Sequence, residues 1–421
     1  PGGAVYARGP LVLAESAVAA NATAGADAPG GALASTGTLT ATAATIEDNA
    51  TEGDGAAGGA LHARGAVVLS EITLAGNATA GAGAPGGAVL AGGALEIALS
   101  TLSDNVTTGA DSPGGAARAL AEGELAGVTA TGNATSGTGS AGGAVSGAGA
   151  MRVADTLFQS NATAGAGASG GALHAGGELT LLRGLVAENA TAGTAAPGGG
   201  IAAEGEATLT LATLAGNAAS GAGSGGGAVH LSRGGSIIAS TITGNLAEGP
   251  GGGVRAEGAV TLGNTILLGN GRGGAAPVAD DLSLGMGAAL AEPGPNILGP
   301  EDAAAEDVFA ATAPLVPGSA VMAGRLGDNG GPMLTVGLAP SGDNPALDAG
   351  ENALLDEVGL GRDLDGDGQT ANALLADARG TGFARILDLD APEGPAGARA
   401  DLGAIELGTR VVPPAAIADT V

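Results

Sequence analysis

The residues best suited to chemistry lie in a short acidic segment near the C-terminus. Asp363, Asp365 and Asp367 alternate with other residues, a glycine follows them, and Gln369 comes next. Carboxylates at positions 1, 3 and 5, Gly at position 6 and a backbone carbonyl at position 7 are the ligand pattern of a calcium loop. The segment therefore predicts a structural calcium site formed by Asp363, Asp365, Asp367 and the carbonyl of Gln369.

The twelfth position of this loop departs from the calcium pattern. It is occupied by Leu374, so the usual bidentate carboxylate is missing. Asp377, Asp356 or Glu351 would have to replace it from outside the loop. An acidic turn without metal is the alternative, and the sequence leaves both open.

The acidic segment follows a long repeat, because most of the chain before it has one strict period. Asparagines and paired glycines recur every 28 residues through the first 250 positions. Each unit contains three short stretches of alternating polarity separated by Gly or Asn, with no helical period. The pattern predicts an all-β fold, a right-handed parallel β-helix solenoid of about ten 28-residue coils with three short strands each. We expect residues 1–275 to form this β-helix and residues 276–421 an irregular C-terminal continuation.

The asparagine column predicts an amide ladder. Stacked amides can donate and accept along the axis of the rod, and Asn also tolerates the left-handed backbone of a tight turn. Seven of the nine are N-x-T sequons, so glycosylation is the alternative, but Asn217 and Asn245 keep the column without the Thr. We therefore expect inward, mutually bonded amides at Asn21, Asn49, Asn77, Asn105, Asn133, Asn161, Asn189, Asn217 and Asn245.

The core of such a rod must be thin and aliphatic. Aromatic residues make up 1% of the 421 residues, whereas the hydrophobic fraction is 44%. A column three residues before each Asn predicts stacked core side chains. Its members are Val18, Ile46, Leu74, Leu102, Ala130, Phe158, Val186, Leu214 and Ile242.

The catalytic residue types are sparse and scattered. A polysaccharide lyase needs a base and cations, but all 14 basic residues are Arg and there is one tyrosine, Tyr6. The histidines, His62, His174 and His230, share one column but lie at least two coils apart, about 10 Å, so they cannot share a metal. We predict that they face outward and that the protein is not an enzyme.

The net charge of −28 restricts the partners. It disfavours nucleic acid, and no apolar run is long enough for membrane insertion of this segment. The absence of cysteine excludes disulfides and thiolate metal sites. Because the chain begins inside a repeat, we expect it to be a processed or trimmed piece.

The C-terminal third carries individual motifs instead of repeats. In order these are NILG at 296–299, LGDNGGP at 326–332, NPALDAG at 344–350, DARG at 377–380 and DLGAIE at 401–406. With the repeats, they resemble the choice-of-anchor Q family of bacterial secreted right-handed parallel β-helix proteins, which is related in style to polymorphic outer-membrane-protein repeats. Met333, Val336-Gly337 and Leu347 depart from the family pattern. The resemblance implies export and surface display and supplies no activity.

Charged residues in these end motifs predict a structural cap. We expect buried pairs between arginines and carboxylates to bind the returning loops to the final coils. The residues concerned are Asp348, Asp377, Arg379, Arg385, Asp401 and Glu406.

Together these features predict an exported, non-enzymatic structural or adhesive rod of a bacterial cell surface or extracellular fibre. Self-association or a cell-surface carbohydrate partner would suit such a rod. Two alternatives stay open: a carbohydrate-active enzyme, either lyase or hydrolase, with its site in the C-terminal loops, and a self-assembling filament subunit.

Overall fold

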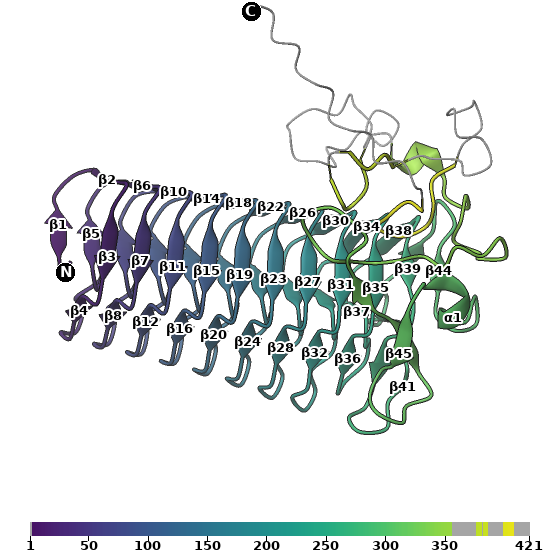
Figure 1. Cartoon of the computed structure of the whole chain (residues 1–421). Coiled ribbons are helices and arrows are strands. Elements are labelled where there is room, and N and C mark those ends of the chain that lie inside the picture. The colour runs from purple at the N-terminus through teal and green to yellow at the C-terminus, as the bar shows by residue number, and fades with distance from the viewer. Residues whose placement is uncertain (1, 356–375, 381, 386–398, 408–421) are drawn as a thin grey trace, which may run out of the picture.

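The chain winds into a stack of parallel coils, seen side-on in Figure 1. The computed structural model describes residues 2–355, 376–380, 382–385 and 399–407. Four 11-stranded sheets run along the stack, and all of their strands except the last one of the fourth sheet pair in parallel with their counterparts one coil away. The predicted parallel β-helix is therefore confirmed. With strands about 4.8 Å apart, the eleven levels span about 50 Å.

Each coil contains four strands, one more than the sequence pattern indicated. In a middle coil they are β17 (Ala117–Ala119), β18 (Gly123–Ala126), β19 (Thr129–Thr131) and β20 (Ala134–Thr135). The fourth strand follows the asparagine directly and has only two residues, which is too short for an alternation to be visible in the sequence. It is nevertheless paired, since the Ala134 N–H donates to the carbonyl of Asn105 at 2.9 Å.

The sheet formed by the first strand of each coil is called sheet A here. It consists of β1 (Val5–Ala7), β5 (Leu33–Ser35), β9 (Leu61–Ala63), β13 (Val89–Ala91), β17, β21 (Val145–Gly147), β25 (Leu173–Ala175), β29 (Ile201–Ala203), β33 (Val229–Leu231), β37 (Val254–Ala256) and β42 (Leu282–Leu284). The register is 28 residues from β1 to β33 and shortens to 25 at β37, where Val229 pairs with Val254.

The other three sheets follow the same order. Sheet B runs from β2 (Leu11–Ala14) to β43 (Leu290–Ala291), and sheet C from β3 (Ala17–Ala19) to β44 (Ile297–Leu298). Sheet D starts at β4 (Ala22–Thr23) and reaches β40 (Gly271–Arg272), on which β41 (Val278–Ala279) pairs antiparallel. Parallel pairing therefore continues to residue 298.

Paired glycines make the sharp corner before the strands of sheet A from β1 to β37. Gly142 has φ +74°, and a Cβ there would lie 2.3 Å from the carbonyl oxygen of Val145. A Cβ on Gly143 would lie 2.0 Å from the carbonyl oxygen of Gly171 in the next coil. One glycine thus supplies a left-handed backbone and the other the space for close stacking.

The interior is a single aliphatic stack. The predicted column before each asparagine is buried from Ile46 to Ile242, and Val18 is partly buried in the first coil. Phe158 fills the position that smaller residues occupy elsewhere, and it is fully buried.

The described residues beyond 299 pack against the last coils (Figure 1). They form a short helix and two antiparallel hairpins, and one 3₁₀ turn: α1 (Ala305–Val308), β45 (Thr312–Pro314), β46 (Met322–Gly324), β47 (Leu326–Gly327), β48 (Thr335–Val336) and η1 (Asn352–Leu355). A second apolar cluster joins them to outward residues of the coils such as Ile238 and Ile266. Within the described ranges, no helix is long and apolar enough to cross a membrane.

Candidate functional site

The asparagine column forms a continuous, buried amide ladder. Each Oδ1 accepts two hydrogen bonds from the Asn of the preceding coil, one from its backbone N–H and one from its Nδ2, at 2.8–3.1 Å. The second Nδ2 hydrogen of Asn133 donates to the carbonyl of Leu102 at 2.9 Å. One amide thus connects three coils, and the predicted ladder is confirmed.

The ladder extends beyond its predicted last member. Asn245 donates to Asn270, and Asn270 donates twice to Oδ1 of Asp281, both at 2.8 Å. Asp281 is 7% exposed. Burial raises its pKa to about 6, while the hydrogen bonds from Asn270 act in the opposite direction and Asp280 adds to the rise. A buried carboxyl group with a raised pKa therefore ends the ladder.

The expected left-handed backbone lies at the residue before the asparagine, so placing it on Asn was wrong. Ala20, Asp48, Asp104, Ser160 and Glu188 have φ between 55° and 57°. The asparagine itself stays in an ordinary conformation because its side chain must point inward to the ladder.

The threonine two residues after each asparagine has a structural role of its own. Thr135 is buried, and its Oγ1 donates to the carbonyl of Ser140 at 2.5 Å, across the loop that follows. The other six sequon threonines make the same bond to the carbonyl five residues later. The sequon thus coincides with a ladder residue and a loop clamp, and six of its seven asparagines have fully buried side chains.

The predicted calcium ligands Asp363, Asp365, Asp367 and Gln369 lie outside the described residues, so the calcium site stays a prediction. Asp377, a suggested replacement ligand, is already engaged: its Oδ2 lies 2.5 Å from Nη2 of Arg379 and accepts the N–H of Glu406. Among the residues that the structure describes, no group of three or more His, Asp or Glu could hold a metal ion.

The charged end motifs form the expected cap. Arg385 is fully buried, lies 3.3 Å from Oε2 of Glu406 and donates to the carbonyls of Asp401 and Gly403. The backbone N–H of Ala404 donates to Oγ1 of Thr241 at 3.0 Å, which attaches this segment to a coil. Burial is the main cause that raises the pKa of Asp401 to about 6. These pairs hold the C-terminal segments together.

The three histidines face outward at the middle of β9, β25 and β33 and are half-buried. Burial lowers the pKa of His62 to about 4, with nearby Arg64 adding to the effect. Burial also lowers the pKa of His230, opposed by Glu257 and assisted by Arg255. His62 is therefore neutral at physiological pH.

A polar array that sequence reading missed crosses four coils on the outward side of sheet A. Arg118 Nη1 donates to Ser146 Oγ at 2.5 Å, Ser146 Oγ lies 3.3 Å from His174 Nδ1, and His174 Nε2 lies 3.1 Å from Glu204 Oε1. The hydrogen bond from His174 is the largest cause that lowers the pKa of Glu204. Arg118, Ser146 and His174 are 28 residues apart in the sequence. This spacing becomes visible only when residues of different types at the same position of successive coils are compared.

The Ser–His–Glu order resembles a hydrolase triad, but the serine is not accessible. Ser146 has no exposed surface, and both of its neighbours in the array contact its hydroxyl. A nucleophile must reach the substrate carbon, so the structure favours a positioning role for Ser146. It holds the half-buried Arg118 and His174 in place.

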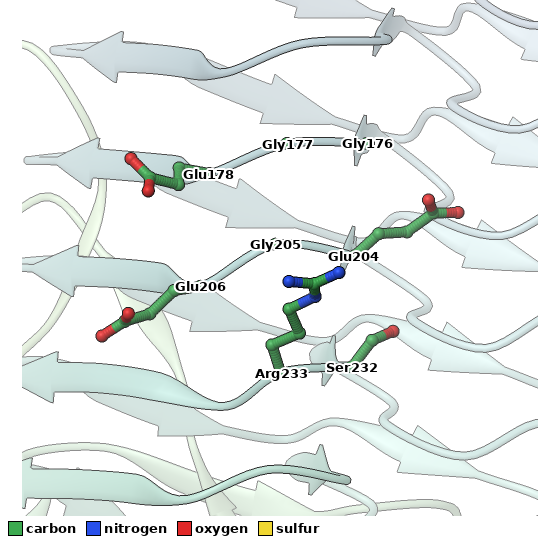
Figure 2. A pocket seen from close by; sticks show the side chains of 8 residues that line it. All are labelled: Gly176, Gly177, Glu178, Glu204, Gly205, Glu206, Ser232 and Arg233. Carbon is green, nitrogen blue, oxygen red and sulfur yellow. The ribbon is translucent and has the colours of Figure 1, made fainter.

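A shallow depression of about 850 Å³ lies at the corner between sheets A and B (Figure 2). It is lined by Gly176, Gly177, Glu178, Glu204, Gly205, Glu206, Ser232 and Arg233. The glycines leave its floor without side chains, and Arg233 reaches from its own coil toward Gly205. Glu178 and Glu206 are 28 residues apart in the sequence, and the stacking of the coils brings them to one corner.

Comparisons of the chain with protein-family models, with curated proteins and with solved structures found no match.

Proposed function

We propose that the chain is an exported, non-enzymatic structural or adhesive rod of a bacterial cell surface or extracellular fibre. The observation that carries this proposal is the amide ladder, which connects eleven levels from Asn21 to Asp281 through ten links of two hydrogen bonds each. Every link from Asn49 onward is buried, so bending or shearing the stack would strand polar groups in the core.

The stack of coils favours a function that depends on the length of the rod. Each coil contacts its neighbours along the axis, and stability accumulates coil by coil in such solenoids. The inward columns are nearly uniform, whereas outward positions differ from coil to coil. The excess of 42 acidic residues over 14 arginines favours a soluble surface on this apolar, glycine-rich rod.

The bacterial and extracellular part of the proposal rests on the resemblance of segments 296–299, 326–332, 344–350 and 401–406 to the choice-of-anchor Q family. A calcium ion at Asp363, Asp365, Asp367 and Gln369 would act structurally in that setting.

Incubation with a panel of acidic and neutral polysaccharides tests the proposal. A structural or adhesive rod leaves the polymers intact. New reducing ends or unsaturated ends would contradict it and favour the carbohydrate-active alternative. Electron microscopy of the same preparation would reveal filaments if the chain assembles end to end.

A further inference from the structure

The outward face of sheet A carries tyrosine, histidine and arginine side chains in one line along the rod. Its column reads Tyr6, Ala34, His62, Leu90, Arg118, Ser146, His174, Ala202, His230, Arg255 and Ser283 in successive coils. All three histidines and the single tyrosine of the chain lie in this column. A ligand that follows the rod axis would meet them in sequence.

A groove is already formed over the first four coils of this column. Its volume is about 370 Å³, and its floor includes Tyr6, His62 and Leu90. Arg64 stands at one side, and loop residues including Asp27 form the other. Leu90 pairs directly with Arg118, so the groove leads onto the polar array.

Arg118 carries a cationic charge that the protein leaves without a close partner. Its Nη1 donates to Ser146, while its Nε is buried with no hydrogen-bond partner in the described structure. No ion pair joins Arg118 to a described carboxylate, although Glu204 acts on it electrostatically from three coils away. By contrast, Arg183 pairs with Asp155 and Arg255 with Glu257.

This arrangement is unusual in a chain with three acidic residues for each basic one. A half-buried guanidinium that lacks a carboxylate has lost hydration without gaining a charge partner. An incoming carboxylate would supply that charge partner.

An extended peptide would fit this face less well than a sugar chain. The strands from β5 to β37 each pair with a neighbour on both edges, so the face offers no free strand edge for main-chain pairing. The lining instead presents separate donors and acceptors from Arg64, His62 and Asp27, beside the ring of Tyr6. Hydroxyl-rich rings match such a lining.

We propose that the outward face of sheet A, from Tyr6 to Glu204, binds an acidic polysaccharide whose carboxylates contact Arg64 and Arg118. These two arginines lie two coils apart, about 10 Å along the axis. The inference rests on the proposed adhesive function, because it names the adhesive surface and its ligand. The net charge of −28 opposes approach at long range, but screening over about 8 Å at physiological salt leaves the local contacts to decide binding.

Binding of polygalacturonate oligosaccharides to the full chain tests the proposal. The measurement is isothermal titration calorimetry in chelator, so that calcium cannot bridge the two anionic partners. Arg118→Gln should weaken binding about tenfold or more, because it removes a charge-assisted contact in a half-buried site. Arg183→Gln is the matched control, since Arg183 is an arginine of the same rod that already pairs with Asp155.

Two further ligands make the outcome specific. Carboxyl-reduced oligosaccharide should bind more weakly than the acid form, and poly-L-glutamate should bind more weakly than the sugar of equal charge. Absence of polygalacturonate binding, or equal loss in Arg118→Gln and Arg183→Gln, would overturn the proposal. Poly-L-glutamate binding as tightly as the sugar would overturn the choice of polysaccharide.

The same samples separate this inference from the proposed function. Intact oligosaccharide without binding would contradict only the ligand assignment. New chain ends would contradict the non-enzymatic rod, even where binding still depends on Arg118.

Discussion

Replacement of Asp281 by Asn should stabilise the protein at neutral pH by completing the ladder with an amide. The raised pKa means that the folded state binds a proton more readily than the unfolded chain between the ordinary value of 3.8 and about 6. Stability from this group is therefore fully present below pH 4 and is lost as the pH rises through about 6. With each pKa unit worth about 1.4 kcal/mol, the ionised carboxylate costs about 3 kcal/mol at pH 7.

The Asn side chain removes this cost while keeping the geometry. Its Oδ1 can accept the same two hydrogen bonds that Asn270 donates to Asp281. The variant should match the wild type near pH 4 and exceed it by up to about 3 kcal/mol above pH 7. Asp401, whose pKa is also raised, is present in both proteins and cancels in the difference.

Urea unfolding at pH 4 to 8 gives the free energies, because urea leaves the ionic strength unchanged. Asp343→Asn removes one exposed carboxylate away from the ladder and is the control for net charge. A stability difference for Asp281→Asn that does not vary with pH, or a variant less stable than wild type at pH 7, would refute the reasoning.

Three more predictions concern the loop clamp, the cap and the calcium loop. Thr135→Val should lower the free energy of unfolding by about 1–3 kcal/mol, because the buried carbonyl of Ser140 loses its hydrogen-bond donor. Urea unfolding measures this change, and an unchanged midpoint would contradict the stabilising role of the Thr135 hydrogen bond. Glu406→Gln breaks the buried ion pair with Arg385, so it should raise hydrogen exchange in segments 399–407 and 376–380 and leave the middle coils protected. A uniform increase in exchange along the chain would argue against a local cap. Calcium should raise the melting temperature of the wild type but not of the Asp363→Ala, Asp365→Ala variant, and identical melting of the wild type in calcium and in chelator would exclude the site.

The fold could be predicted because each coil repeats the same physical problem. Inward side chains such as Leu102 stack on their own counterparts, so a 28-residue period in the sequence is directly a stack in space. The ladder was predictable for the same reason, since amides at one position of every coil must meet. The two-residue fourth strand was not, because Ala134 and Thr135 cannot display an alternation.

The polar array could not be predicted from the type of any one residue. Arg118, Ser146 and His174 are chemically different, and only the register of sheet A brings them into contact. The extension of the ladder was missed for a related reason. Asn270 and Asp281 are 25 and 36 residues beyond Asn245, so loops of changed length conceal their equivalence.

The central claim, that a buried amide ladder holds the coils together, is tested most directly by equilibrium unfolding of Asn133→Ala. This change strands the backbone N–H and one Nδ2 hydrogen of Asn105. It also removes the Nδ2 donor to the carbonyl of Leu102 and to Oδ1 of Asn161. Two stranded buried donors at about 1–3 kcal/mol each predict a loss of about 2–6 kcal/mol. Gln159→Ala, which removes an exposed amide that bonds Glu188, should change stability by less than about 1 kcal/mol. Equal effects of the two substitutions would contradict the ladder as the element that holds the rod together.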